Sequence, residues 1–225
     1  MLDVIKHQSV FNPSDFDHLR ILVIGAGAVG SSVTLGLAKL GLTNIFVLDD
    51  DVVESHNLPN QYVYGPGDIG VPKVTALKEA VHAATGTHIN IEPRRYEGGK
   101  LLYEVVFMCV DTMAVRKLIT EKGLYINPRV QWAFDTRIDA YQSMSYVFKP
   151  RDFGELASYK ETLYDDEAVT TERGTCGTIL SIGATAQIAS QTTLWLFMQA
   201  LTDKLTANEV ISQVHPSWNM LSRKF

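Results

Sequence analysis

Glycines and carboxylates follow two short apolar runs of this chain, in an order that suits the binding of a nucleotide. The first run is followed by Gly25-Ala26-Gly27-Ala28-Val29-Gly30, and the second by Asp49-Asp50-Asp51. A glycine turn between a strand and a helix lets the backbone approach phosphates, whose charge is met by the N-terminus of the helix. Gly25, Gly27 and Gly30 are therefore the candidate phosphate-binding residues, with a merely structural tight turn as the alternative.

Asp49 stands where the second apolar run ends, 24 residues after Gly25. A carboxylate at this position accepts hydrogen bonds from ribose hydroxyls, in NAD and in ATP alike. Asp49 therefore predicts a nucleotide without choosing between the two. For Asp50 and Asp51 the alternative is an acidic turn that only faces solvent.

Amide and amine side chains follow the acidic turn. Asn57 and Gln61 are four residues apart, so they share a face if the segment forms a helical turn. Lys73 starts the next predicted helix, where an ammonium group can offset phosphate charge. Taken one by one, Asn57 and Gln61 also suit capping and surface positions, and local sequence favours a solvent-exposed Lys73.

Asp111 comes directly after the apolar run 105–110, a predicted strand. Ligands of open α/β sheets bind beyond the carboxyl ends of strands, and Mg²⁺ bridging phosphates prefers carboxylate oxygens. Asp111 is therefore the candidate Mg²⁺ ligand, and it is also a candidate N-cap for the following helix. We expect Arg116, near the solvent or cap face of that helix, to be structural.

The chain contains two cysteines, Cys109 and Cys176. Cys109 lies within a predicted strand and is expected in the core. Cys176 precedes a long predicted helix, and a helix N-terminus lowers the pKa of a thiol, which makes a nucleophile chemically reasonable. A small packing residue is the alternative for Cys176, since most cysteines behave as small buried apolar groups.

The elements that position these residues predict an α/β fold. Short apolar strands alternate with amphipathic helices, which is typical of a doubly wound, mostly parallel Rossmann-like sheet with helices on both faces. Two later strands with alternating apolar residues predict an antiparallel extension. The expected strands are residues 21–24, 45–48, 89–92, 105–110, 131–134 and 143–148. Apolar residues at helical spacing predict a helix that follows the glycine turn and stops at Gly41, and further helices are expected to start at Pro72 and near Thr112.

We interpret residues 1–225 as a single domain whose nucleotide-binding half spans 18–125. Residues 151–175 are polar and poor in aliphatic side chains, which predicts a surface crossover loop. Residues 178–201 predict one long helix. Gln187, Ser190 and Gln191 within it are typical of a buried helix in a water-soluble protein and argue against a membrane span.

Composition excludes several other classes of protein. The 225 residues are 46% hydrophobic, which favours a packed core over disorder. The net charge is −5 and the basic residues are scattered, which argues against nucleic-acid binding, because phosphate contacts need a concentrated basic patch. Residues 1–10 lack the apolar core of a signal peptide, so we expect a cytoplasmic protein.

In combination, these motifs resemble the ThiF/MoeB/HesA family, the bacterial relatives of ubiquitin-activating enzymes. A dehydrogenase needs the glycine turn and the first acid but not the residues that follow. The resemblance covers roughly residues 8–201 and rests on Gly25-Ala-Gly-Ala-Val-Gly30, Asp49-x-Asp51, Asn57-Leu58-x-x-Gln61, Ile69-Gly70-x-Pro72-Lys73-Val74, Val110-Asp111 with Arg116, and the loop, cysteine and helix at Cys176.

The resemblance implies an adenylyltransferase that uses ATP and Mg²⁺ to activate the C-terminal carboxylate of a small ubiquitin-like (sulfur-carrier-like) protein or a peptide, as a homodimer. The glycines would hold phosphates and Asp49 the ribose, with Asp111 on Mg²⁺. The implied catalytic residues are Lys73, Asp111 and Cys176, and the implied cofactor-binding residues are Gly25, Gly27, Gly30, Asp49, Asp51, Asn57, Gln61, Lys73 and Asp111.

Three departures from the family pattern point to a short, specialised member. The family has an arginine where this chain has Asn60, so another cation, from Arg94, Arg95 or Arg116, must replace it, or activity is reduced or lost. The segment Lys6-His7-Gln8 stands where relatives contribute a phosphate-binding arginine to the partner subunit. The Cys-x-x-Cys pairs that hold zinc in many members are absent, so no zinc is expected.

Other functions remain open at this point. The same site could activate a carboxylate on tRNA or on a small molecule, although the acidic net charge disfavours tRNA. With Asn60, the chain could also be a catalytically degenerate nucleotide-binding scaffold. An NAD dehydrogenase is disfavoured because it leaves Asn57, Gln61, Lys73 and Asp111 unexplained.

Overall fold

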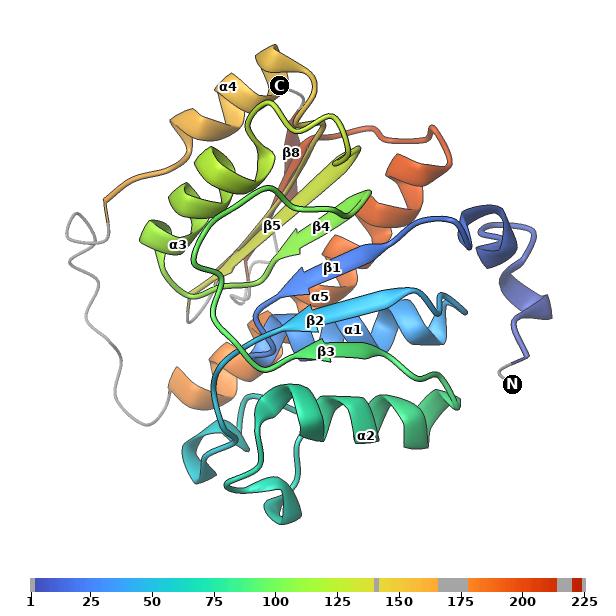
Figure 1. Ribbon diagram of the computed structural model, residues 1–225, viewed down its shortest axis with the longest axis vertical. Coiled ribbons are helices and arrows are strands. Elements are labelled where there is room, and N and C mark those ends of the chain that lie inside the picture. Colours follow the sequence, from blue (N-terminus) through green and yellow to red (C-terminus); the bar gives the residue numbers. More distant parts are fainter. Residues whose placement is uncertain (1–2, 140–141, 166–177, 214–219, 224–225) are drawn as a thin grey trace.

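The structure is a computed structural model that describes residues 3–139, 142–165, 178–213 and 220–223. Within these residues, one eight-stranded sheet with the order β3-β2-β1-β4-β5-β6-β7-β8 forms the centre (Figure 1). Its strands are β1 Ile21–Ile24, β2 Ile45–Leu48, β3 Asn90–Glu92, β4 Val105–Met108, β5 Trp132–Ile138, β6 Gln142–Phe148, β7 Glu209–Gln213 and β8 Met220–Arg223.

Strands β1 to β5 are parallel to one another, and β6, β7 and β8 continue the sheet in antiparallel pairs. The predicted α/β fold, with its parallel sheet and late antiparallel extension, is confirmed. In the parallel register Ile24 lies beside Leu48 on one side and beside Met108 on the other. The segments that leave β1, β2 and β4 therefore start at the same edge of the sheet.

Helices cover both faces of the sheet, with α1, α2 and α5 on one face and α3 and α4 on the other (Figure 1). Two apolar cores result. In β1, Ile21 and Val23 belong to the first core and Leu22 and Ile24 to the second, which explains why the whole strand is apolar. The helices are α1 Ala28–Lys39, α2 Lys73–Thr85, α3 Met113–Leu118, α4 Phe153–Glu161 and α5 Thr178–Leu201.

Helix α5 has the bounds expected from the sequence and packs closely against α1. A Cβ on Gly36 of α1 would lie 2.2 Å from the Leu194 Cδ1 atom of α5, so the Leu194 side chain packs in this position directly on the α1 backbone because residue 36 is a glycine. None of the helices in the described ranges combines the length and hydropathy that a membrane crossing requires.

The prediction of a surface loop over 151–175 is wrong for its first part, because α4 lies there. The Asp152 side chain caps this helix by accepting hydrogen bonds from the backbone N–H groups of Gly154 and Glu155. Leu156 and Tyr159, three residues apart, are buried against the sheet, which outweighs the polar composition of the segment. Residues 166–175 lie outside the described part of the chain.

The core contribution of α5 can be measured with two substitutions on this helix. Phe197 is fully buried, with ring centroids 5.6 Å from Phe107 and 5.9 Å from Phe134, so Phe197→Ala should cost about 3–5 kcal/mol of unfolding free energy. The exposed Gln191→Ala should change it by less than about 0.5 kcal/mol. Urea unfolding followed by circular dichroism measures both, and equal losses would contradict this packing.

Candidate functional site

Two glycines shape the turn between β1 and α1, and a third faces open space. Gly25 has a φ of +97°, and a Cβ there would lie 2.4 Å from the carbonyl oxygen of Cys109. A Cβ on Gly30 would lie 1.9 Å from the carbonyl oxygen of Gly25. Around a Cβ on Gly27, no atom would lie within 4 Å. The first two glycines are therefore required by the turn itself, and Gly27 leaves the space above it free.

Side chains from two later segments hold the glycine turn in place. The Ala26 N–H donates to Asp49 Oδ2 at 2.6 Å, and Tyr64 Oη donates to the Ala26 carbonyl oxygen at 2.6 Å. The other carboxylate oxygen of Asp49 accepts from the Asp51 N–H at 2.8 Å. Burial raises the pKa of Asp49, and these N–H groups oppose that rise. Asp49 thus has a structural role in the turn, and its predicted ribose contact stays a prediction.

Lys73 is buried, which corrects the expectation of a solvent-exposed lysine. Its side chain is 8% exposed, and Nζ lies 2.8 Å from Asp51 Oδ2. The local backbone explains the burial, because the Lys73 N–H donates to the Asp51 carbonyl oxygen at 2.9 Å and Val52 pairs with Pro72. These contacts fold the start of α2 onto the acidic turn, so Lys73 and Asp51 act as one unit at the edge of β2.

The amides of the Asn57 to Gln61 segment differ in their hydrogen bonding. Asn57 is buried and caps its own turn, since its Oδ1 accepts from the Glu54 N–H at 2.9 Å. Gln61 is 8% exposed, and its Oε1 is buried without a hydrogen-bond partner among the described residues. The same holds for Oδ1 of Asn60. The capping role of Asn57 is confirmed, whereas Gln61 keeps a polar atom available for a ligand.

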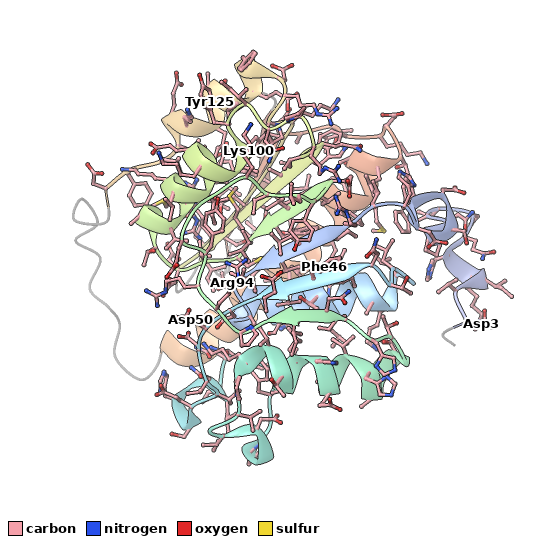
Figure 2. The ribbon with its side chains drawn as sticks, viewed as in Figure 1. Asp3, Phe46, Asp50, Arg94, Lys100 and Tyr125 are labelled. Atoms are coloured by element: carbon pink, nitrogen blue, oxygen red, sulfur yellow. The ribbon has the colours of Figure 1, made fainter. Side chains whose placement is uncertain are left out.

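Acidic and basic side chains gather where β2 and β3 end (Figure 2). One carboxylate oxygen from each of Asp49, Asp50 and Asp51 lies within 4.8 Å of the other two. Arg95 Nε is 3.2 Å from Asp50 Oδ2, and Arg94 pairs with Glu92 at 2.7 Å. Arg94 and Arg95 were candidates to replace the family arginine that is Asn60 in this chain. Both are exposed, but each already pairs with an acidic side chain.

Asp111 is exposed and follows β4 at the same edge of the sheet. Its prediction as an N-cap is wrong, because Thr112 caps α3 by accepting from the Val115 N–H at 3.4 Å.

Cys109 packs under the glycine turn, and burial raises the pKa of its thiol to about 12, which excludes a thiolate at neutral pH. Cys176 lies outside the described residues.

Arg116 is structural, as expected, but it is 4% exposed and does not lie on a solvent face. It pairs with Asp135, which belongs to β5 and was missed by the sequence reasoning together with Arg137. The expected strand ended at residue 134, whereas β5 continues to Ile138. The available signal was the spacing of Asp135 and Arg137, because residues two apart in a strand lie on the same face, where opposite charges can pair. Arg116 is therefore not available as a phosphate ligand, because it is buried and its Nε and Nη2 atoms are held by Asp135 and by backbone carbonyl oxygens.

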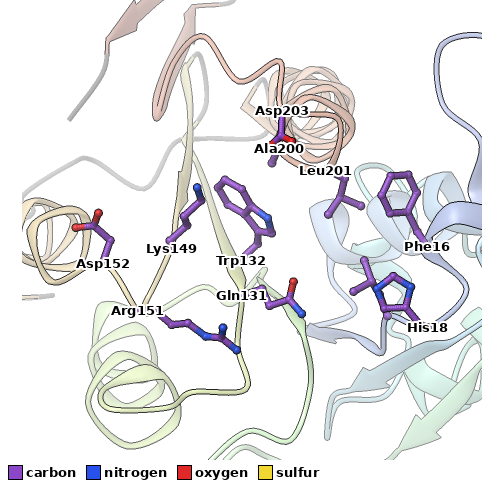
Figure 3. Close-up of a pocket in the computed structure, with 11 residues that line it drawn as sticks. Phe16, His18, Gln131, Trp132, Lys149, Arg151, Asp152, Ala200, Leu201 and Asp203 are labelled. Atoms are coloured by element: carbon purple, nitrogen blue, oxygen red, sulfur yellow. The ribbon is translucent and has the colours of Figure 1, made fainter.

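A cavity of about 560 Å³ lies at the opposite edge of the sheet (Figure 3). It is formed where β5 begins and α5 ends, so it has no part in the site around the glycine turn. Lys149 lies over the Trp132 ring there, 4.7 Å from the centroid. The other lining residues are Phe16, His18, Leu19, Gln131, Arg151, Asp152, Ala200, Leu201 and Asp203.

Comparison with known proteins gives consistent matches. A model of the ThiF family matches residues 13–217. The probable adenylyltransferase/sulfurtransferase MoeZ of Mycobacterium tuberculosis is 26% identical over 157 residues, which are 67% of this chain and 40% of MoeZ. The adenylyltransferase and sulfurtransferase UBA4 of Yarrowia lipolytica is 34% identical over 120 residues, which are 49% of this chain and 29% of UBA4.

Among solved structures, E. coli MccB with ATP has a TM-score of 0.70 at 13% identity, covering 94% of this chain and 65% of MccB. At this identity the likeness concerns the fold alone. The chain spans less than half the length of MoeZ and of UBA4. The family resemblance predicted from the motifs is confirmed.

The different roles of the glycines give a test that needs no ligand. Gly30→Ala should destabilise the fold by more than about 2 kcal/mol, because its Cβ would overlap the backbone at Gly25. Gly27→Ala should change stability by less than about 0.5 kcal/mol, since its Cβ would meet open space and its φ of −74° suits alanine. Thermal unfolding compares the two, and a large loss for Gly27→Ala would refute the open side of the turn.

Proposed function

The chain belongs to the ThiF family, and we propose that it uses ATP and Mg²⁺ to adenylate the C-terminal carboxylate of a small ubiquitin-like protein or of a peptide. The relatives named above are adenylyltransferases, and MccB has been solved with ATP. Because the chain spans only part of each relative, the proposed activity and substrate rest on the chain's own residues.

The observation that carries the proposal is the position of Lys73. A cation is 8% exposed at the edge that also holds the glycine turn, and it is held there by the more exposed Asp51. Burying an ammonium group is costly unless an anion is near, and a triphosphate would supply further negative charge. A nicotinamide dinucleotide would be held by the glycine turn and Asp49, and its binding would not explain why Lys73 is buried at this edge.

ATP fits the arrangement of the site. The open space above Gly27 allows phosphate oxygens to approach the backbone at the N-terminus of α1. Gln61 adds a buried oxygen atom that has no partner in the described structure and can accept a hydrogen bond from the nucleotide. The turn therefore offers donors to phosphates, and the neighbouring segment offers an acceptor.

Mg²⁺ fits best at Asp111. The carboxylates of Asp49, Asp50 and Asp51 are engaged by the glycine turn, Arg95 and Lys73 respectively, so a cation would have to displace existing partners. Asp111 is an exposed oxygen ligand at the same sheet edge. One or two carboxylates together with substrate phosphates are the usual protein environment of Mg²⁺.

In the proposed reaction, a carboxylate oxygen of the substrate attacks the α-phosphorus of ATP, the bond from that phosphorus to the bridging oxygen of the β-phosphate breaks, and pyrophosphate leaves. Bound Mg²⁺ would neutralise charge on the triphosphate. Lys73 and the N–H groups at the start of α1 would stabilise the negative charge that develops, and Asp49 would orient the ribose. Catalysis would come from positioning and electrostatics.

We propose a homodimer and a cytoplasmic location. The amino-terminal segment packs at the far end of α1, where His7 Nε2 lies 3.2 Å from the Leu40 carbonyl oxygen. The glycine turn is at the other end of this helix, which is about 18 Å long. Lys6 therefore cannot easily serve the site of its own chain, and a role in phosphate binding would require a partner subunit.

Asn60 supports one alternative, a nucleotide-binding scaffold without catalysis. An amide in place of the family arginine removes a bidentate phosphate donor. Arg116 cannot replace it, and Arg94 and Arg95 are held by Glu92 and Asp50. Tight ATP binding without any adenylate, for every carboxylate substrate tried, would favour the scaffold. Activation of a carboxylate on tRNA is less favoured by the net charge of −5.

Nucleotide binding by calorimetry tests the site. ATP with Mg²⁺ should bind more tightly than NAD, and Asp111→Ala should weaken Mg²⁺-dependent ATP binding by at least about ten-fold, because the metal loses its protein ligand. Asp17→Ala removes an exposed carboxylate at the opposite edge and serves as the matched control. Preference for NAD, or equal binding by both variants, would contradict the proposal.

A separate experiment addresses Cys176, whose proposed role as nucleophile rests on the sequence alone. If Cys176 accepts the activated acyl group or carries sulfur, Cys176→Ser should leave ATP–pyrophosphate exchange unchanged and abolish transfer from the adenylate. Adenylation is expected to survive because it is assigned to other residues, namely Lys73, Asp49 and Asp111. Loss of both steps, or of neither, would remove the nucleophile assignment.

A further inference from the structure

Asp135 lies at the centre of a buried polar network that the proposed reaction leaves unused. Its side chain is fully buried in β5. Oδ1 accepts from Arg116 Nε at 2.8 Å, whereas Oδ2 accepts from Arg137 Nε at 2.7 Å and from Tyr159 Oη at 3.0 Å. One carboxylate thus holds two arginines that extend to different loops.

The Arg116 arm reaches the peptide that precedes Asp111. Its Nη2 atom donates to the carbonyl oxygen of Val110, and the same atom lies 3.3 Å from the carbonyl oxygen of Thr136. The Val110 carbonyl belongs to the peptide plane that joins Val110 to Asp111. Fixing this plane limits rotation of the backbone at Asp111 and therefore the direction of its side chain.

The Arg137 arm reaches the end of α4. It donates to the carbonyl oxygen of Thr162 at 2.8 Å and to its hydroxyl at 2.9 Å, and its guanidinium stacks 4.5 Å from the Tyr146 ring centroid. After α4 the chain returns to α3, where Asp165 contacts Lys117. Both arms thus act on segments that meet beside α3.

The network is charged, although its burial is costly. Burial alone would raise the pKa of Asp135, but the two guanidinium groups hold this pKa below its usual range. Buried ion pairs contribute little stability compared with well-packed apolar residues, because desolvation offsets their attraction. Their geometric specificity is the better physical account of this arrangement, in which each carboxylate oxygen holds one planar guanidinium.

We propose that Asp135 is a positioning residue shared by the segment that carries Asp111 and by the end of α4. Through Arg116 it fixes the peptide that carries Asp111, and through Arg137 it fixes the end of α4. The effect on metal binding rests on the proposed role of Asp111 in binding Mg²⁺. The anchoring of the two loops does not depend on that role.

Three variants separate the two arms. Arg116→Lys keeps a positive charge but cannot hold both Asp135 and Val110 in the planar geometry, and Arg137→Lys is the equally buried control on the other arm. Asp135→Asn weakens both arms at once. Amide hydrogen exchange of the nucleotide-free protein, read by mass spectrometry, should accelerate around 110–116 for the first variant, around 159–165 for the second and in both segments for the third.

Mn²⁺ affinity, measured by titration with a non-hydrolysable ATP analogue present, provides the second measurement. Arg116→Lys and Asp135→Asn should weaken it roughly ten- to a hundred-fold, the usual effect of removing a residue that orients a metal ligand. Arg137→Lys should leave it near the wild-type value. Equal weakening by the two lysine variants would overturn the proposal.

Uniformly faster exchange along the chain in all three variants would also overturn it, because that result means general destabilisation. If Arg116→Lys does not fold, Asp135→Asn compared with Arg137→Lys gives the same contrast in segment 110–116. If the local exchange pattern is found but the wild type binds no Mn²⁺, the anchoring stands and the proposed function of Asp111 fails.

Discussion

The hydrogen bond from the Ala26 N–H to Asp49 Oδ2 is the contact on which the site depends. It joins the turn after β1 to the end of β2, and Asp49 also receives the N–H of Asp51. Asp51 in turn holds Lys73, so the glycine turn, the acidic turn and the start of α2 have one common support. The parallel register makes this possible, because it brings the ends of β1 and β2 to the same height.

Much of this could be predicted because the information is local. The glycine turn, the acid after β2 and the bounds of α5 follow from strand length, turn chemistry and helical spacing, and the structure contains all three. Burial of Lys73 could not be predicted in this way, because it depends on a backbone pairing between Val52 and Pro72. Helix α4 was missed because two buried residues in a polar segment give a weak periodic signal.

The network around Asp135 could not be predicted from the sequence either, because it joins residues from distant segments of the chain. Asp135 and Arg137 are two residues apart in β5, but the second arginine of the network, Arg116, comes from α3, 19 residues before Asp135. β5 is also the last parallel strand, and β6 beside it runs antiparallel. The charged cluster therefore lies where the sheet changes direction, between the parallel strands β1 to β4 and the segment that contains α4.

Helix α5 also affects how the protein is made. The apolar side of α1 is covered by α5, through the close approach of Gly36 to Leu194 and a hydrogen bond from Gln187 Nε2 to Ser32 Oγ at 2.9 Å. The ribosome finishes α1 long before it adds α5. At about 5–20 residues per second this delay lasts roughly 10 to 30 s. During that time the nascent first half exposes an uncovered apolar surface, which is the kind of surface that chaperones bind.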